Sequence, residues 1–314
     1  MNLKNKEFEY LVINNEITIK RYISNQEEVV IPESISNMPV TKIGDFCFSS
    51  CSSIKSIEIP ASVVIIGMRA FSNIYYLKNV IIPNSVKEIG KFAFAECSEL
   101  NYVWVGDGVK ILPESLFEKC HCLVEVRFPN RLEEIEVLAF SLCKRLVSAD
   151  LGCNLRKIGI GAFYDCASIK EVRIPDSVHT IEVNAFKGCK NIRKVTMPKH
   201  LNCLGGSAFQ GCEEISELYI GENVKVIEDY TFEGCFGLEF ISLPQNLKII
   251  GNRAFRNCKG LLKFKIPDSV EKIGDRAFEG CNLKTRLEAL RVAKKTCSPR
   301  PSFSLVEKVF TRGV

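Results

Sequence analysis

The strongest constraint on this fold is a phenylalanine that recurs every 23 residues without a slip. The eleven members of the series are Phe48, Phe71, Phe94, Phe117, Phe140, Phe163, Phe186, Phe209, Phe232, Phe255 and Phe278. Three residues after each stands a cysteine, with Ile74 as the single exception, at Cys51, Cys97, Cys120, Cys143, Cys166, Cys189, Cys212, Cys235, Cys258 and Cys281. A fixed period of this length is typical of equal coils stacked in register, because one coil alone cannot bury its apolar face. The sequence therefore predicts a repeat solenoid of eleven 23-residue coils.

Each repeat opens with a segment that suits a short strand. Apolar Leu238, Ile241 and Leu243, for example, are separated by variable residues, as expected of a half-buried strand. A proline follows at positions 60, 83, 129, 175, 198, 244 and 267, and a glycine takes its place at 106, 152 and 221. Proline lacks the N–H that a strand ladder needs, so the strand ends there. We expect a parallel β-sheet on one face of the solenoid, with short turns and irregular segments elsewhere.

The complete repeat is plain in residues 261–281, which read LLKFKIPDSVEKIGDRAFEGC. This pattern resembles the BspA-like branch of the leucine-rich repeat family, whose repeats read IPxSVxxIGxxAFxxCxxL, over about residues 30–283. The resemblance implies a parallel-stranded solenoid that binds other molecules and has no catalytic centre. Family members are often surface-exposed or secreted adhesin-like proteins. The chain departs from the pattern at an insertion, residues 32–43, and where Gly106 and Gly152 replace the usual proline.

Both ends of a solenoid expose apolar edges and need caps. We expect three parts: a capping hairpin over residues 1–30, the leucine-rich repeat solenoid over 31–283, and a capping helix with a basic, Pro/Ser-containing tail over 284–314. The hairpin is predicted from alternating apolar and polar residues on both sides of Asn14-Asn15. The helix is predicted over 284–295, because Leu283, Leu287 and Leu290 recur at helical spacing.

Composition bounds the class of protein and its compartment. A hydrophobic content of 46% with 25% charged residues is that of an ordinary soluble protein, and no apolar stretch approaches the ~20 residues of a membrane span. The start, MNLKNKEFEYLVINN, lacks the apolar core of a signal peptide, which favours a cytoplasmic location. The alternative is a cell-surface or secreted protein without a visible signal. Of the net charge of +5, residues 284–314 carry +6, so the remaining residues sum to −1.

The fifteen cysteines raise the possibility of disulfides or a metal site. Ten of them occupy one position of the repeat, where Ile74 also fits, so we expect buried free thiols that pack as small apolar groups. Ligands in one line do not surround a tetrahedral metal ion, and we expect no metal. Many unpaired thiols also suit a reducing compartment. Cys47, Cys122, Cys153, Cys203 and Cys297 lie off the series, and Cys297 is expected to be the most exposed.

The sequence carries no arrangement of catalytic residues. His121, His179 and His200 fall in variable positions of separate repeats, and no phosphate-binding loop, dinucleotide fingerprint or HExxH motif is present. We therefore expect a protein that is not an enzyme and binds no cofactor. Nucleic acid is also disfavoured, because a near-neutral body with mixed charges lacks the continuous basic stripe that such binding needs.

Exposed aromatic and arginine side chains on the strand face are the residues expected to bind a partner, because these types dominate interface hot spots. Tyr102 and Trp104 share one expected strand, and Ile81 lies one coil away. Tyr219 and Phe240 lie on adjacent strands further along. Between the two groups are basic residues, Arg127, Lys170, Arg173, Arg193 and Lys194, interrupted by Glu125, Asp150 and Glu171.

Taken together, these patterns predict a non-enzymatic scaffold that binds a protein or peptide on its strand face. The alternative function is a surface-exposed or secreted adhesin that binds host or matrix proteins. The sequence is compatible with two roles for Trp104: an anchor for a partner, or a side chain that packs against neighbouring coils and shields the core. The sequence does not determine the oligomeric state.

Overall fold

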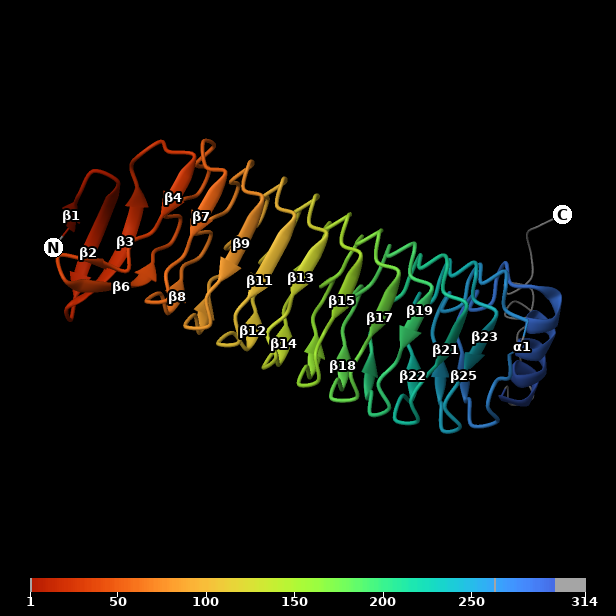
Figure 1. The fold of residues 1–314 in the computed structure, drawn as a ribbon. Helices are drawn as coiled ribbons and strands as arrows, with labels where there is room; N and C mark the ends of the chain where they lie inside the picture. Colours follow the sequence, from red (N-terminus) through yellow and green to blue (C-terminus); the bar gives the residue numbers. More distant parts are fainter. Residues whose placement is uncertain (1, 263, 297–314) are drawn as a thin grey trace. The chain divides into compact units, whose positions relative to one another are not determined.

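The computed structural model describes residues 2–262 and 264–296. The chain divides into two units, Met1–Leu155 and Arg156–Val314. Each unit is a solenoid of stacked 23-residue coils with parallel strands, which confirms the predicted fold class (Figure 1). The basic tail beyond residue 296, including Cys297, lies outside the described residues. So does Lys263, an outward position of the last coil.

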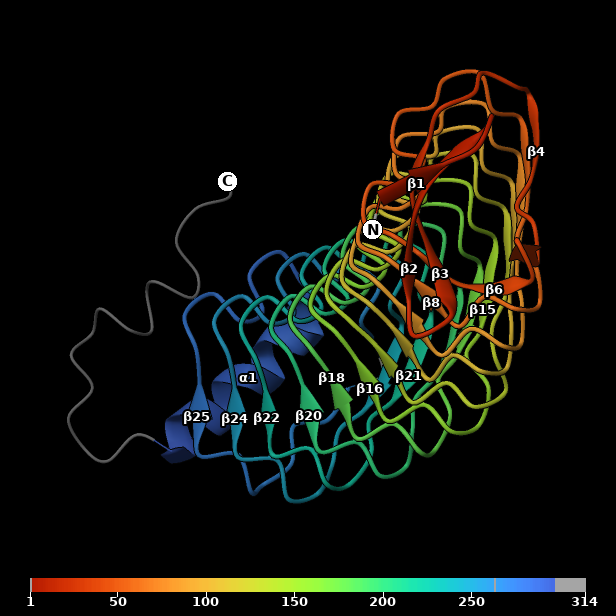
Figure 2. The same cartoon turned by 90° about the vertical axis from the view of Figure 1, so that its left-hand side faces the viewer.

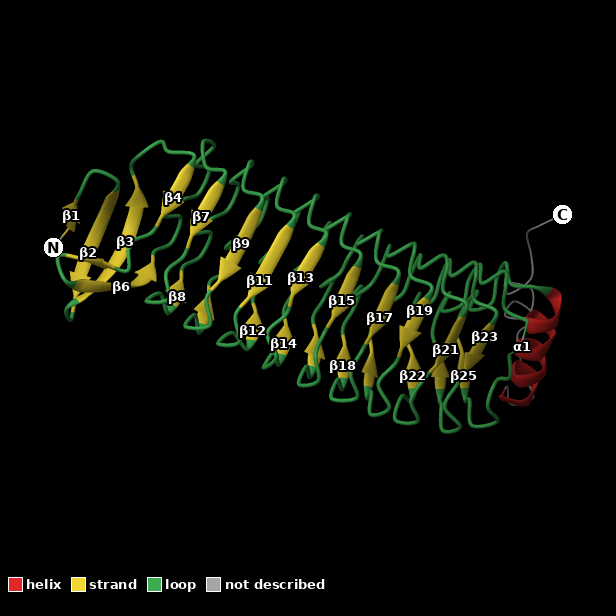
Figure 3. Ribbon diagram, viewed as in Figure 1, coloured by secondary structure: helices red, strands yellow, loops and turns green. Residues whose placement is uncertain are grey.

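Most coils contribute two short strands, although only the first was predicted (Figure 3). The first strand occupies the predicted segment before the proline, and the second ends at the isoleucine of the Ile-Gly pair, as in β8, which Gly67 follows. In the first unit, the first strands are β4 (Glu28–Val30), β7 (Ser56–Glu58), β9 (Asn79–Ile82), β11 (Tyr102–Val105), β13 (Glu125–Arg127) and β15 (Ser148–Asp150). Its second strands are β6 (Met38–Ile43), β8 (Ile65–Ile66), β10 (Glu88–Ile89), β12 (Ile111–Leu112) and β14 (Glu134–Ile135).

The second unit repeats this plan and ends in the helix α1 (Leu283–Thr296). Its first strands are β17 (Glu171–Arg173), β19 (Lys194–Thr196), β21 (Glu217–Tyr219) and β23 (Phe240–Ser242). Its second strands are β16 (Lys157–Ile158), β18 (Thr180–Ile181), β20 (Cys203–Leu204), β22 (Val226–Ile227), β24 (Ile249–Ile250) and β25 (Lys272–Ile273). Figure 2 shows β20, β22, β24 and β25 side by side in one row.

Strand pairing keeps the period of the sequence. In β11, Trp104 is opposite Ile81 of β9 and Arg127 of β13, each 23 residues away. Because these pairings keep a separation of 23 residues, a given repeat position forms a row of side chains within each unit. Variable positions of the first strands therefore form outward rows, as the sequence analysis assumed.

The phenylalanine series forms the centre of each unit. All eleven rings are at most 1% exposed. Neighbouring rings stack with centroids 4.9–5.7 Å apart from Phe48 to Phe140 in the first unit, and 5.2–6.0 Å apart from Phe163 to Phe278 in the second. Each buried ring contributes roughly 1.5–3 kcal/mol through the hydrophobic effect, so the two stacks are a principal source of stability.

The cysteines of the series have a polar role as well as the predicted packing role. Eight buried thiols each donate a hydrogen bond, at 3.0–3.2 Å, to the carbonyl of the phenylalanine 26 residues earlier; they belong to Cys97, Cys120, Cys143, Cys189, Cys212, Cys235, Cys258 and Cys281. An alanine or valine at this position fits an apolar site but has no hydrogen to donate. Cysteine is therefore suited to this position by its small size and its S–H group together.

Each coil turns sharply on both sides of its phenylalanine. The residues two before and two after it have positive φ in every coil, for example Ser207 (55°) and Gly211 (73°) around Phe209. Left-handed backbone favours glycine. Yet most of these positions hold other residues, such as Lys119 with φ of 60°.

The N-terminal segment forms a hairpin that continues the second-strand sheet of the first unit. Strand β1 (Asn2–Lys4) pairs with β2 (Phe8–Ile13), which pairs with β3 (Glu16–Tyr22), and β3 pairs in parallel with β6. Asn14 and Asn15 form the turn with φ of 51° and 59°, as a two-residue hairpin turn requires. Tyr22 stacks on Phe48 at 5.3 Å, so the hairpin also extends the aromatic stack. The insertion between β4 and β8 forms a second small hairpin, in which β5 (Ser34–Ile35) pairs with β6.

At the other end, α1 lies against the last coil of the second unit. The Asn282 side chain accepts a hydrogen bond from the Thr285 N–H at 3.0 Å, which caps the start of the helix. Thr285, Ala289 and Val292 are buried, whereas Leu287 is 56% exposed. Leu287, one of the leucines whose spacing predicted the helix, therefore lies on its exposed side. The buried face spaces smaller side chains at i, i+4 and i+7, which lets the helix approach the coil closely.

Candidate interaction surface

The first unit carries an aromatic cluster on the outward rows of β9, β11 and β13. We call it the tryptophan patch and define it as Ile81, Tyr102, Trp104 and Arg127. The register places Ile81, Trp104 and Arg127 in one row, with Tyr102 two residues from Trp104 on the same strand. The structure thus brings four of the predicted site residues together. Three of them have the neighbours that the sequence predicted, and Arg127, which was assigned to a separate basic group, joins them.

Trp104 lies on the surface of the first unit and is not part of its core. The inward residues of its strand, Val103 and Val105, are 0% and 1% exposed, whereas the Trp104 side chain is only partly covered. The Arg127 guanidinium lies over the indole ring, 4.3 Å from its centroid. This contact holds both side chains in place on the surface, since a cation over an aromatic face is attracted by the ring's electron density.

The patch has an apolar centre and a charged rim. Ile81 is 56% exposed and Tyr102 is partly exposed. At the outward positions one coil before Ile81 and one coil after Arg127 stand exposed Glu58 and Asp150. An apolar, aromatic centre with a polar rim is the usual anatomy of a protein–protein interface.

Two further exposed groups of the first unit escaped the sequence analysis. Val30, which is 63% exposed, pairs with Glu58 and so extends the outward row of the patch. Tyr75 and Tyr76, 48% and 49% exposed, have ring centroids 4.9 Å apart at the turn before β9. The sequence did mark the position of the tyrosines, because they directly follow Ile74, the one residue that interrupts the cysteine series.

The predicted basic residues of the second unit do not form a free basic band. Lys170, Arg173 and Lys194 are exposed on β17, β19 or the turn before them, but Lys194 is paired in register with Glu171 on one side and Glu217 on the other. The Arg193 guanidinium lies 2.7 Å from the Glu214 carboxylate. This hydrogen bond raises the pKa of Arg193 above its usual value. Acidic neighbours thus offset much of the positive charge.

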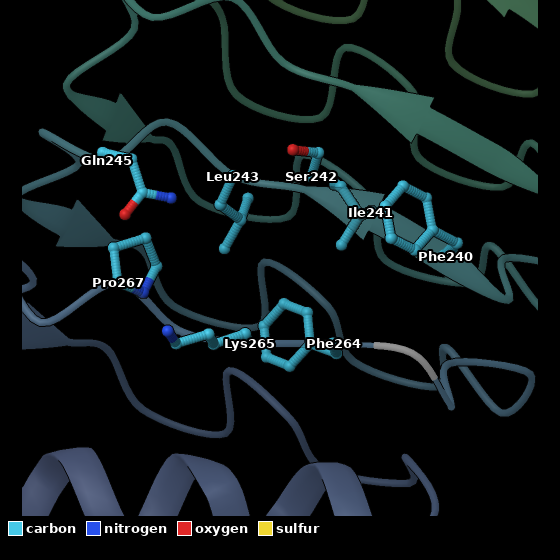
Figure 4. A pocket seen from close by; sticks show the side chains of 8 residues that line it. All are labelled: Phe240, Ile241, Ser242, Leu243, Gln245, Phe264, Lys265 and Pro267. Carbon is cyan, nitrogen blue, oxygen red and sulfur yellow. The ribbon is translucent and has the colours of Figure 1, made fainter.

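The second aromatic pair lies beside a pocket in the second unit. Tyr219 is 60% exposed, and its ring lies 5.3 Å from that of Phe240. Phe240 borders a cavity of about 310 Å³ between β23 and the last coil (Figure 4). The cavity is lined by Phe240, Ile241, Ser242, Leu243, Gln245, Phe264, Lys265 and Pro267. The sequence analysis identified Tyr219 and Phe240 but gave no indication of this pocket.

Within residues 2–262 and 264–296, no three His, Cys, Asp or Glu side chains are grouped so that they could hold a metal ion. The only helix in the same ranges, α1, is too short and too polar to cross a membrane.

Comparisons with known proteins agree with the geometry. The family model described as the BspA type leucine-rich repeat region matches residues 41–170 and 156–284, with six copies. The crystal structure of a leucine-rich repeat protein from Bacteroides ovatus aligns with a TM-score of 0.62 at 25% sequence identity, covering 95% of this chain and 99% of the other. A leucine-rich cell surface protein from Faecalibacterium prausnitzii aligns at 23% identity and a TM-score of 0.42, covering 100% and 98% of the two chains. No curated protein matches.

Proposed function

Because this chain belongs to the BspA-type leucine-rich repeat family, we propose that it is a scaffold that binds a protein or peptide through the tryptophan patch of its first unit. Leucine-rich repeat proteins are generally protein-interaction scaffolds, and the family is typically non-enzymatic. The observation that carries the proposal is Trp104, a tryptophan held on the surface under the Arg127 guanidinium.

The physical argument rests on hot-spot chemistry and on preorganisation. Tryptophan, tyrosine and arginine contribute most to binding when a partner covers them, and the patch holds one of each beside exposed Ile81. The ring of Trp104 is already held by Arg127, so less side-chain freedom is lost when a partner binds. Glu58 and Asp150, at the two ends of the row, would add specificity more than affinity.

Affinity capture with the full chain tests the proposal. Wild-type protein, the double variant Tyr102→Ser/Trp104→Ser and the control Ile111→Ser would each be exposed to cell lysate and to an extract of intact cell surfaces. Ile111 is a matched control, because it is a 47% exposed apolar residue of β12, a second strand in the same unit. We expect a partner retained by wild type and Ile111→Ser and lost by the double variant, with all three melting within a few degrees of one another.

The proposal would be wrong if all three proteins captured the same partners, or if the double variant lost both the partner and its thermal stability. The second result would mean that Trp104 supports the coils and is not an anchor.

The compartment is a separate prediction. We propose that the protein works in the cytoplasm, and the row of buried free thiols supports this, since unpaired thiols suit a reducing environment. Protease treatment of intact cells provides the test: a protein of the cytoplasm survives, whereas a surface adhesin is cleaved.

A further inference from the structure

The pocket of the second unit lies beside a coil in which one inward repeat position holds a larger residue than in the coils before it. The inward position at the middle of the first strand holds Val195, Leu218 and Ile241 in successive coils, and Phe264 in the last. The Phe264 ring is partly exposed and packs against the core, with its centroid 5.7 Å from Phe255 and 5.3 Å from Phe278. Within residues 264–296, no first strand continues the sheet beyond β23. Among the described residues β23 is therefore the last of the first strands, and the cavity lies beside it.

The lining of the cavity has two chemical parts. Ile241, Leu243, Phe264 and Pro267 provide an apolar floor. The hydroxyl of Ser242, the amide of Gln245 and the ammonium group of Lys265 provide polar groups around it (Figure 4). A volume of about 310 Å³ is at the small end of the range for ligand pockets, which suits one large apolar side chain.

Among the described residues that line the pocket, Lys265 is the one that carries a charge. Lys265 is exposed and forms no ion pair with any carboxylate of residues 2–262 and 264–296. The acidic group of α1 that acts on Lys265 electrostatically is Glu288, and both of its oxygens are held by Arg291 at 3.0 Å. The exposed Lys265 ammonium is therefore accessible to a carboxylate from outside.

We propose that this pocket binds an extended peptide segment that inserts one large apolar side chain and pairs an adjacent Asp or Glu with Lys265. The apolar floor selects the side chain, and the free cation selects the acid beside it. The neighbouring Tyr219–Phe240 pair offers further exposed aromatic surface for the rest of the peptide. This site lies in the second unit and is independent of the tryptophan patch.

Fluorescence anisotropy with labelled hexapeptides tests the site on the full chain. The probes are GSFDSG, the uncharged GSFNSG and the side-chain-deleted GSGDSG. One buried aromatic ring and one charged pair predict a dissociation constant on the order of 0.1–1 mM for GSFDSG. Both altered probes should bind roughly 10-fold more weakly, because each loses one of the two interactions.

Variants locate the binding. Lys265→Gln should weaken the binding of GSFDSG roughly 10-fold and leave the binding of GSFNSG unchanged, since only the first peptide carries the acid. Ser242→Trp should fill the cavity and abolish binding of both. Lys225→Gln is the matched control, because Lys225 is an exposed lysine of the same unit outside the pocket lining, and it should change neither probe. Trp104→Ser should also have no effect, which separates this proposal from the function proposed for the first unit.

Several outcomes would overturn the proposal. Equal binding of GSFDSG and GSFNSG would remove the role of Lys265, and unchanged binding by Ser242→Trp would place the peptide elsewhere. Binding of decanoate without binding of any peptide would assign the pocket to lipid carboxylates. A concentration-dependent dimer that Ser242→Trp disrupts, with no peptide binding, would assign it to a second copy of the chain.

Discussion

The left-handed residues on both sides of each phenylalanine set the local geometry of the coil. Gly211 has φ of 73°, and a Cβ built there would meet only Gly188 atoms at an ordinary 3.9 Å. The cost of a side chain at this position is therefore one of backbone conformation and not of space.

Gly211→Ala should lower the free energy of unfolding by about 1 kcal/mol, because alanine is strained at this φ. Lys119→Gly, at the same repeat position with φ of 60°, should lower the free energy of unfolding only slightly or raise it slightly. Urea unfolding at pH 7 measures both. Equal losses for the two substitutions would show that side-chain contacts, and not backbone conformation, dominate here.

Because its thiols are buried, the folded protein should lose stability as the pH becomes alkaline. Burial raises the pKa of Cys97 from 9.0 to about 12, so the native state keeps its proton where the unfolded chain has lost it. The stabilisation is complete below pH 9 and is lost as pH rises from about 9 to 12. Each such thiol removes roughly 1.4 kcal/mol of unfolding free energy per pH unit in that window.

Urea titrations between pH 7 and 10.5 provide the check. Cys97→Ala should reduce the alkaline slope by roughly 1.4 kcal/mol per pH unit compared with wild type, whereas Cys153→Ala, at an exposed cysteine, should leave it unchanged. A slope in Cys97→Ala identical to that of wild type would mean that the buried thiol does not remain protonated.

At the scale of elements, the terminal helix shows how much depends on one capping residue. Asn282 accepts the Thr285 N–H and also donates its amide to the Leu261 carbonyl, and the Thr285 hydroxyl donates to that same carbonyl. The start of α1 is thus fastened to the last coil by side chains from both residues.

Asn282→Ala should cost about 1–2 kcal/mol of unfolding free energy, since it removes a helix cap and a hydrogen bond to the coil. Leu287→Ala, on the exposed face of the same helix, should change stability by less than about 0.5 kcal/mol. Thermal unfolding compares the two. A larger loss from Leu287→Ala would mean that the helix packs by the opposite face.

Elements that repeat were predictable, and those that depend on one unusual residue were not. The proline after each apolar segment marked the first strands, but the second strands are mostly only two residues long, too short to show an alternating pattern. The helix was expected at its observed place, but the exposure of Leu287 was not predictable, because leucine spacing alone does not reveal which face of the helix can approach the coil closely.

At the scale of the molecule, almost all of the fold could be predicted from the 23-residue period. A fixed register turns repeat positions into rows, so the outward placement of Ile81, Tyr102 and Trp104 followed from counting alone. The contact of Arg127 with Trp104 did not, because a rotamer is set by local packing. The pocket was also not predictable from the sequence, because it depends on how the partly exposed Phe264 ring packs beside β23.

The central claim is that a partner covers the tryptophan patch, and Trp104 is itself the reporter because the chain has a single tryptophan. The most direct measurement is its fluorescence emission during titration with the captured partner, monitored in a tryptophan-free version of that partner. Burial of the indole should shift the emission to shorter wavelength in step with binding, in wild type and in Ile111→Ser alike. Saturable binding without any shift in emission would contradict the account, because the partner would then occupy another surface.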